Sequence, residues 1–448
     1  MTTTSAERER LPRTLGLWSA VAVLVGSTIG SGIYRVPARV ADLIGEPQMI
    51  LFAWVLGGVI ALAGALTMAE LAAAMPRSGG VFAYILEAFG PLPAFLFGWT
   101  ELAVIRASAL GAIATIFAEY LGYFLPLTAA QVRYVAAGAV VAVGILNYVG
   151  VQTAARLMNG VTLIKYAALA AIVALAVTSG EGSASHFSGP GAHAATTSLV
   201  FTALVSIMWT YDGWADLAFM GGEVRDPATT LPRALILGTT AIVIIYLCLN
   251  LAFLYLVPAD EMGSSALIAA TAAERIGAFG GKGGAIISAV VLVSCLGSLN
   301  GSMMTGPRIF FAMADQGLFF SQIATVSPRY KSPSVAIGLA TVLGVGYVLL
   351  NDFQQLADKF ILGIWPFYAL AVAAVFVLRR TQPDLPRPYR TLGYPVVPAI
   401  FLLASVAMVV NAVVTDPANT GVTFGIIGAG VPAYFLWRAR GRGSVKGG

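Results

Sequence analysis

Residues 26–34 read Gly26-Ser27-Thr28-Ile29-Gly30-Ser31-Gly32-Ile33-Tyr34, and they lie inside the first apolar stretch of the chain. Three glycines and three small hydroxyl side chains come together near the middle of that stretch. These residue types form helix poorly, because glycine leaves the backbone free and hydroxyls compete for its hydrogen bonds. The run therefore predicts a break in a membrane-spanning helix.

A second run of the same kind follows five apolar stretches later. It reads Trp209-Thr210-Tyr211-Asp212-Gly213-Trp214, with an ionisable Asp212 before Gly213. An offset of five spans means that the second five-span unit is inverted relative to the first. Paired interruptions in two inverted halves indicate the binding site of a secondary transporter. The alternative is that the glycines only permit close helix packing, which explains one Gly-rich span better than two at matched positions.

Composition requires lipid as the solvent. Of the 448 residues, 58% are hydrophobic and 10% are charged, and the mean hydropathy is +0.84. Soluble domains carry about 25% charged residues. About twelve stretches reach the ~20 apolar residues that a spanning helix needs. Their centres lie near Val25, Ile60, Ala107, Val141, Ala168, Met208, Ile244, Val293, Gly344, Ala371, Ala404 and Ile427. We therefore expect an all-α membrane protein with twelve transmembrane helices, built as a 5+5 inverted repeat in which helices 1 and 6 are broken.

The basic residues predict the orientation. Cytoplasmic loops carry an excess of Lys and Arg, and placing the N-terminus inside leaves roughly a third as many outside. Both termini are then cytoplasmic, in the cell (inner) membrane. The net charge of +5 reflects these loop ends and does not indicate nucleic-acid binding. The expected segments are a cytoplasmic N-terminus (1–14), a first repeat (15–178), an extracellular loop with His186 and His193 (179–198), a second repeat (199–380), two further spans (381–437) and a basic cytoplasmic tail (438–448).

The freed backbone at the two breaks predicts the ligand. Unwound helix in a bilayer is tolerated where it lines a cavity, with N–H groups at one end and carbonyls at the other. An amino acid carries a carboxylate and an ammonium on adjacent atoms, and it fits between two such ends. We expect amides near Gly30, Ser31 and Gly32 to hold the carboxylate. Carbonyls near Ser27, Thr28 and residues 209–212 (Trp209, Thr210, Tyr211 and Asp212) would hold the ammonium, with Gly213 allowing the second break.

Ionisable residues within the spans are further candidates. Lys165, in the fifth span, could fix an ammonium beside the broken first helix, or switch by losing its proton. The bland alternative is that Lys165 extends to the cytoplasmic interface near Arg156. Glu101 and Arg106 are five residues apart, which places them on different faces of an α-helix and argues against a direct pair. A structural role is expected for Arg106, and a contact with a cationic substrate side chain is an alternative role for Asp212.

Several motifs resemble one transporter family. They are Arg77-Ser78-Gly79-Gly80, Tyr84-Ile85-Leu86-Glu87, Phe89-Gly90-Pro91, Trp99-Thr100-Glu101-Leu102 with Ile105-Arg106, Gly30-Ser31-Gly32-Ile33, Tyr211-Asp212-Gly213-Trp214, Asp226-Pro227, and Leu299-Asn300-Gly301-Ser302. Across nearly the whole chain, these runs are similar to the L-type amino-acid transporters, the light-subunit type of the amino acid–polyamine–organocation superfamily.

The resemblance implies sodium-independent exchange of amino acids. It implies that Lys165 stands in the position where related folds hold sodium. It further implies that Trp209 is the gating aromatic, that Trp365 is a pocket aromatic of the tenth span, and that Asn300 is structural. An aromatic in an apolar span is otherwise most often packing, and for Trp209 the adjacent break favours the gate.

Departures from the family pattern concern partners and specificity. Eukaryotic members carry a cysteine between spans 3 and 4 that links to a heavy subunit, and the loop Pro126–Gln131 has none. The two cysteines, Cys248 and Cys295, lie in apolar stretches, so no disulfide-linked heavy subunit is expected. Ala107 and Ala215 replace a proline and a polar residue of the family, which leaves the local helix geometry and the side-chain preference open.

The sequence therefore predicts a stand-alone exchanger of L-amino acids, with neutral ones expected and no cofactor or metal. A proton-coupled symporter using Lys165 is the alternative, followed by a sodium symporter and a carrier of polyamines or cationic substrates. An intramembrane enzyme would need a nucleophile–base pair or metal ligands within the bilayer, and both histidines lie in one loop. A channel would need a continuous polar pore rather than two local breaks, and a purely structural protein would have no use for paired breaks.

Overall fold

The computed structural model describes residues 13–76, 79–149, 151–178, 181–188, 194–315, 323, 327 and 332–444. The predicted N-terminal segment and the end of the tail lie largely outside these ranges, as do Arg77 and His193. Within them the protein is helical, and its β-structure is one isolated bridge between Leu15 and Val224. The predicted all-α fold is confirmed.

The α-helices are α1 (Leu17–Thr28), α2 (Val36–Ile44), α3 (Pro47–Ala74), α4 (Gly80–Phe89), α5 (Pro91–Thr100), α6 (Arg106–Leu121), α7 (Ala129–Val149), α8 (Val151–Thr178), α9 (Thr197–Tyr211), α10 (Asp216–Phe219), α11 (Pro227–Leu256), α12 (Ala259–Ser264), α13 (Ile268–Glu274), α14 (Gly283–Asp315), α15 (Ser334–Leu350), α16 (Phe353–Thr381), α17 (Val396–Thr415) and α18 (Pro417–Ser444). Short 3₁₀ turns lie at Gly32–Tyr34 (η1), Ala184–Phe187 (η3), Gly221–Glu223 (η4) and Gly277–Phe279 (η5), and a π-helical segment at Glu101–Ile105 (η2).

The twelve predicted span centres all fall in helices. Eight helices of the described part are long and apolar enough to cross a membrane, and shorter apolar helices include α1, α9 and α15. The long third span is the continuous run Pro91–Leu121. A multi-pass membrane protein is therefore established, whereas the count of twelve stays a prediction because the broken helices are too short to count alone.

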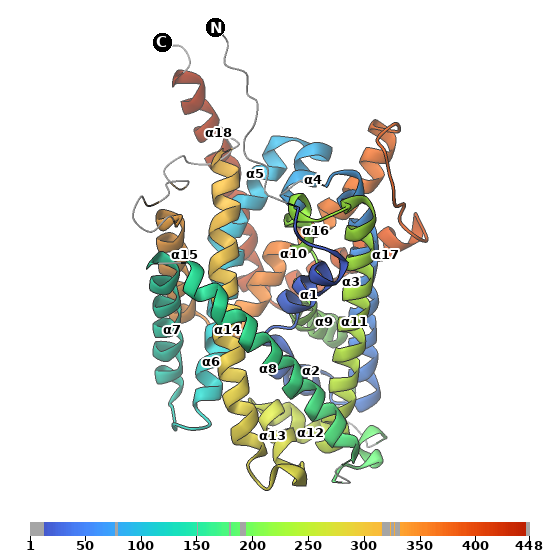
Figure 1. Cartoon of the computed structure of the whole chain (residues 1–448), viewed down its shortest axis with the longest axis vertical. Helices are drawn as coiled ribbons and strands as arrows, with labels where there is room; N and C mark the ends of the chain where they lie inside the picture. Colours follow the sequence, from blue (N-terminus) through green and yellow to red (C-terminus); the bar gives the residue numbers. More distant parts are fainter. Residues whose placement is uncertain are drawn as a thin grey trace.

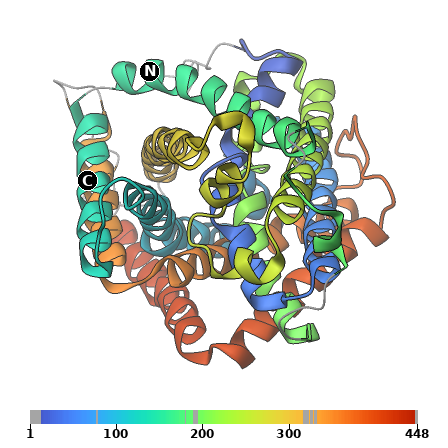
Figure 2. The same cartoon turned by 90° about the horizontal axis from the view of Figure 1, so that it is seen from below.

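Helix contacts divide the molecule into two groups. In the first, α1 packs on α11 and α9 packs on α3; in the second, α6, α7, α14 and α15 pack on one another, with α7 and α15 at the rim (Figure 1, Figure 2). Between the groups, α8 contacts α14 and α11, while α16 contacts α6 and α3. The contacts come in matched pairs. If α1 is exchanged for α9 and α3 for α11, the α1–α11 contact becomes the α9–α3 contact. A five-span repeat predicts this correspondence.

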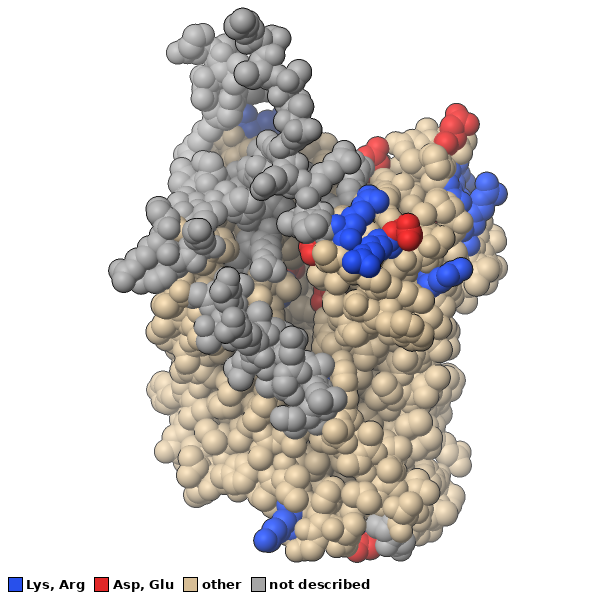
Figure 3. Space-filling model, in the orientation of Figure 1, with Lys and Arg blue, Asp and Glu red and all other residues tan. Residues whose placement is uncertain are grey.

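The charges mark the two ends of the molecule. On the face shown in Figure 3, Lys and Arg gather near the end that carries both termini, and a broad middle band holds neither sign. Large apolar side chains are exposed on the outer helices, among them Val342 of α15 and Leu403 of α17. In water such surface would be unfavourable, so it is surface that lipid tails cover.

Candidate functional site

The first break opens where the sequence predicts it. Helix α1 ends at Thr28, and the chain then turns so that the Gly30 N–H donates to the Thr28 carbonyl at 2.7 Å. Among the described residues, the N–H groups of Ser31, Gly32 and Ile33 donate to no backbone carbonyl. The Ser31 hydroxyl is also buried without a hydrogen-bond partner in this part of the chain. Buried unpaired donors are costly, so this segment is prepared to receive an acceptor such as a carboxylate.

The second break lies directly against the first. Helix α9 ends at Tyr211, Asp212 is extended, and Gly213 has φ +115° before α10 begins at Asp216. A Cβ on Gly213 would stand 2.8 Å from the Thr28 Cα and N atoms. The Ser27 hydroxyl donates to the Gly213 carbonyl at 3.2 Å. Ser27 and Gly213 are 186 residues apart in the sequence. The two interruptions therefore meet in space and form one site.

A tyrosine that the sequence analysis missed joins the two helix ends. The hydroxyl of Tyr246 in α11 lies 2.9 Å from the Thr28 carbonyl and 3.1 Å from the Thr210 carbonyl. Its ring packs against Trp54 and Tyr211, and the Tyr211 hydroxyl donates to the Trp54 carbonyl at 3.3 Å. A tyrosine in an apolar span carries no signal of this role. Tyr246 therefore occupies carbonyls that were expected to face the ammonium, and Tyr211 points away from the break.

Lys165 lies at the first break rather than at the membrane surface. Its side chain, on α8, is 4% exposed, and its Nζ donates to the carbonyl of Ile29, the residue that follows α1. A buried ammonium needs such acceptors, because removal from water is otherwise expensive. The contact excludes the alternative in which Lys165 extends to the cytoplasmic interface.

Trp209 covers the first break from the side of α9. A Cβ on Gly32 would stand 2.8 Å from the Trp209 ring, so only glycine lets the ring lie on this backbone. The other face of Trp209 meets Phe353 of α16 edge-on, with ring centroids 5.5 Å apart. Phe353 in turn lines a cavity. Trp209 thus contacts the break and, through Phe353, the wall of that cavity.

Asp212 and Trp365 belong to the opposite side of the second break. The Tyr368 hydroxyl donates to the Asp212 carboxylate at 2.9 Å. Trp365 is fully buried, stacks on Phe401 and meets Tyr368 edge-on, and Trp214 packs on the same two rings. Trp365 therefore packs against Tyr368, which binds Asp212. No contact between Trp365 and the amides of the first break is found among the described residues.

The expectation that Glu101 and Arg106 do not pair is wrong. Residues Glu101–Ile105 form a π-helical turn, in which residues five apart lie on one face, and the two side chains form an ion pair. Arg106 also donates to the Ser302 hydroxyl of α14 at 2.8 Å. The structural role expected for Arg106 thus has a concrete form, since it ties the third span to α14. Glu101 lies close enough to Asp212 and Asp216 to repel them.

Asn300 joins two helices, and no hydrogen bond from its side chain to either break is found among the described residues. Its Oδ1 accepts from Asn147 Nδ2 at 2.7 Å, which links α14 to α7 within the second helix group. No metal-binding group of three or more His, Cys, Asp or Glu side chains occurs in the ranges that the structure describes.

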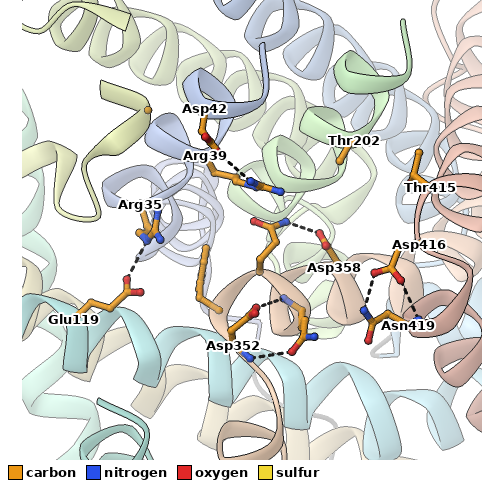
Figure 4. Close-up of a pocket in the computed structure, with 14 residues that line it drawn as sticks. Arg35, Arg39, Asp42, Glu119, Thr202, Asp352, Asp358, Thr415, Asp416 and Asn419 are labelled. Atoms are coloured by element: carbon orange, nitrogen blue, oxygen red, sulfur yellow. Dashed lines mark hydrogen bonds and ion pairs between the residues drawn. The ribbon is translucent and has the colours of Figure 1, made fainter. Parts of the chain in front are cut away.

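A cavity of about 750 Å³ lies next to Phe353, at the end of the molecule that holds α12 (Figure 1), and Figure 4 shows the side chains that line it. Its wall includes Phe353, Gly263 of α12 and Arg35, which follows η1. Arg35 pairs with Glu119 at 3.0 Å and lies over the Phe353 ring at 5.5 Å. The arrangement as a whole offers unpaired amides at one break, helix-end carbonyls at the other, a fixed ammonium, and an aromatic that contacts the first break and, through Phe353, the wall of a polar cavity.

Comparison with known proteins gives a consistent result. The amino acid permease family matches residues 15–435. The serine/threonine exchanger SteT of Bacillus subtilis (strain 168) is 30% identical over 97% of this chain and 99% of its own length. The human cystine/glutamate transporter is 31% identical over 96% of this chain and 86% of its own length. The human b(0,+)-type amino acid transporter 1 is 30% identical, with 93% and 84% covered.

Proposed function

Because the chain belongs to the amino acid permease family, we propose that it exchanges L-amino acids across a membrane by opening the site between its two helix breaks to each side in turn. Family membership also confirms the resemblance to L-type amino-acid transporters that the sequence motifs indicated. The relatives are transporters by name, and we assign no enzymatic activity to the chain.

The observation that carries the proposal is the contact between the two interruptions. Unpaired N–H groups at Ser31 and Gly32 and the unpartnered Ser31 hydroxyl lie where a substrate carboxylate would be stabilised. The acceptors for the ammonium are carbonyls at the end of α9 other than that of Thr210, which Tyr246 occupies, with Asp212 nearby. Backbone groups recognise the part that all amino acids share, so the side chain selects among substrates through its surroundings.

Sodium independence is part of the proposal. The Lys165 ammonium donates to the Ile29 carbonyl at the broken helix, which is the kind of oxygen that a sodium ion would need. A fixed positive charge there satisfies the helix end without a bound ion. Proton coupling through Lys165 is not favoured, since a relative aligned over 99% of its length is named an exchanger.

We further propose a stand-alone transporter, with neutral amino acids as its main substrates and both termini in the cytoplasm of a cell whose plasma (inner) membrane holds it. The absence of cysteine in Pro126–Gln131 supports the first point. The gathering of Lys and Arg at the end with the termini supports the orientation.

The test is uptake of radiolabelled L-amino acids into proteoliposomes. Each amino acid is offered with and without internal amino acid, and with and without a sodium or pH gradient. Uptake that requires internal amino acid and ignores both gradients supports the proposal and identifies the substrates. Uptake into empty vesicles driven by an inward proton gradient would make the protein a symporter, and uptake that no gradient or internal substrate changes would point to a uniporter.

A further inference from the structure

The cavity next to Phe353 carries an excess of negative charge. Five carboxylates line it, from Asp42, Glu119, Asp352, Asp358 and Asp416, against the two guanidinium groups of Arg35 and Arg39. Lys359 lies behind the wall and donates to Asn419 at 3.1 Å. Five negative and three positive charges leave two negative charges in excess, even with Lys359 included.

Four of these carboxylates have structural partners. Asp42 pairs with Arg39 at 2.7 Å, and Glu119 pairs with Arg35. Asp352 caps the first turn of α16, and Asp416 accepts from the backbone and side chain of Asn419 at the first turn of α18. These four side chains therefore already have partners within the fold.

Asp358 is different, because no cation and no helix end is bonded to it in the described part of the chain. Its carboxylate accepts one hydrogen bond, from the Gln354 amide at 2.8 Å (Figure 4). Lys359, Arg39 and the carboxylates of Asp352 and Asp416 act on it without a direct bond. Among the five carboxylates of this wall, that of Asp358 is therefore the one without an ion pair or a capping role in the described part of the chain.

The position of Asp358 places it on the route to the breaks. Phe353, one turn earlier on α16, lines the cavity and packs on Trp209, which lies on Gly32. Gln354 joins Asp358 to α9 as well, since its amide also lies 3.0 Å from the Ser206 hydroxyl. The cavity beside Asp358 is thus the space next to the break from which a solute at this end would approach the site.

We propose that Asp358 sets a charge preference at this end of the transporter, favouring amino acids with a cationic side chain over acidic ones. A confined cavity with low-dielectric walls concentrates counter-ions and excludes co-ions, and salt screens this over about 8 Å at physiological strength. The inference rests on the proposed transport function. It adds that discrimination by side-chain charge begins outside the backbone site that binds the common part of every amino acid.

The experiment measures how well L-lysine and L-glutamate compete with exchange of a neutral amino acid. Proteoliposomes are loaded with the neutral substrate that the wild type exchanges best, and uptake of its radiolabelled form is inhibited by each competitor. Wild type should be inhibited more strongly by lysine, and added salt should narrow the difference. In Asp358→Asn, the lysine-to-glutamate preference should fall about fivefold, while the KM of the neutral substrate stays unchanged.

Two variants separate charge from structure. Asp358→Glu keeps the charge and should keep the wild-type preference. Asp260→Asn removes a carboxylate of α12 that is exposed outside the cavity wall, and it should change nothing. An unchanged lysine-to-glutamate ratio in a folded Asp358→Asn protein would overturn the inference, as would an equal loss for neutral and charged amino acids. Absence of any exchange in the wild type would instead overturn the proposed function.

Discussion

At the scale of single residues, the site depends on positions where a side chain is either required or forbidden. Position 213 does not accommodate a side chain. The φ of Gly213 is +115°, in the left-handed region, and a Cβ there would collide with the Thr28 backbone. We propose that Lys165 is required, because its ammonium donates to the Ile29 carbonyl that follows the end of α1. Each of these two residues belongs to one segment of the chain and contacts the end of another, α1.

Replacing Gly213 with alanine should separate the two breaks. Strain at a position of this kind costs about 1–3 kcal/mol, and the added methyl displaces Thr28. We expect a lower thermal stability in detergent and exchange reduced by at least about tenfold. Gly428→Ala is the matched control, because a Cβ there meets nothing within 4 Å. Equal activity of the two variants would show that the breaks tolerate separation.

Lys165→Ala should stop exchange without unfolding the protein. Loss of a charge-assisted hydrogen bond in a buried site is worth about 1.5–3 kcal/mol, so turnover should fall by about tenfold or more. Lys282→Ala, at an exposed position, should exchange normally. Unchanged kinetics in Lys165→Ala would remove this lysine from the mechanism, whereas new dependence on sodium would support its role as a replacement for the ion.

At the scale of helices and their ends, irregular segments bring charges together. The π-helical turn at Glu101–Ile105 rotates Arg106 onto the face of Glu101, which an ideal α-helix would not do. Near the C-terminal end of α3, the side chain of Glu70 is 1% exposed. Its carboxylate accepts hydrogen bonds from Arg379 and from the backbone N–H and the hydroxyl of Thr391. Arg387 caps the end of α16 by donating to the Leu378 carbonyl. These contacts fasten the α16–α17 loop to α3.

Glu70→Gln should loosen this loop. Removing one partner of a buried ion pair costs about 3–5 kcal/mol, because the remaining charge loses its counter-charge. A clear fall of the unfolding temperature is expected. Glu261→Gln breaks a pair with Arg275 whose side chains are 42% and 36% exposed, and exposed pairs contribute about 0–1 kcal/mol. Similar melting of both variants would show that the Glu70 contacts do not hold the loop.

At the scale of the whole molecule, the helices form two groups, and a cavity of about 750 Å³ lies at the end that holds α12. The group containing α1, α3, α9 and α11 carries both interruptions. The group containing α6, α7, α14 and α15 carries none apart from the π-turn at its border. Relative movement of two packed bodies about a fixed site is how inverted-repeat transporters alternate between the two sides.

The predicted orientation can be measured by labelling with a membrane-impermeant maleimide. In a background with Cys248 and Cys295 replaced, Ser264→Cys in α12 should react in intact cells, because it is exposed at the end opposite the termini. Asp384→Cys, in the exposed loop after α16, should react only after the cells are permeabilised. The reverse pattern would invert the topology and place the charged cavity in the cytoplasm.

The sequence by itself determined the solvent, the class of fold and the place of the two breaks. These follow from composition and from short-range preferences, since apolar runs need lipid and clustered glycines do not stay helical. Asp212, Gly213 and the break that follows Thr28 could therefore be placed without knowledge of the fold, although residues 26–28 remain in α1.

Only the tertiary structure decided which side chains complete the site. Tyr246 joins helix ends that lie 36 and 218 residues away in the chain, and Tyr368 reaches Asp212 across 156 residues. A pairing of this kind depends on how each helix is rotated and packed. The sequence does not give that rotation, because every apolar span that contains a tyrosine shows the same pattern. The Glu101–Arg106 pair shows the same limit at short range, because one extra residue in a turn, invisible in the sequence pattern, changes which face a charge occupies.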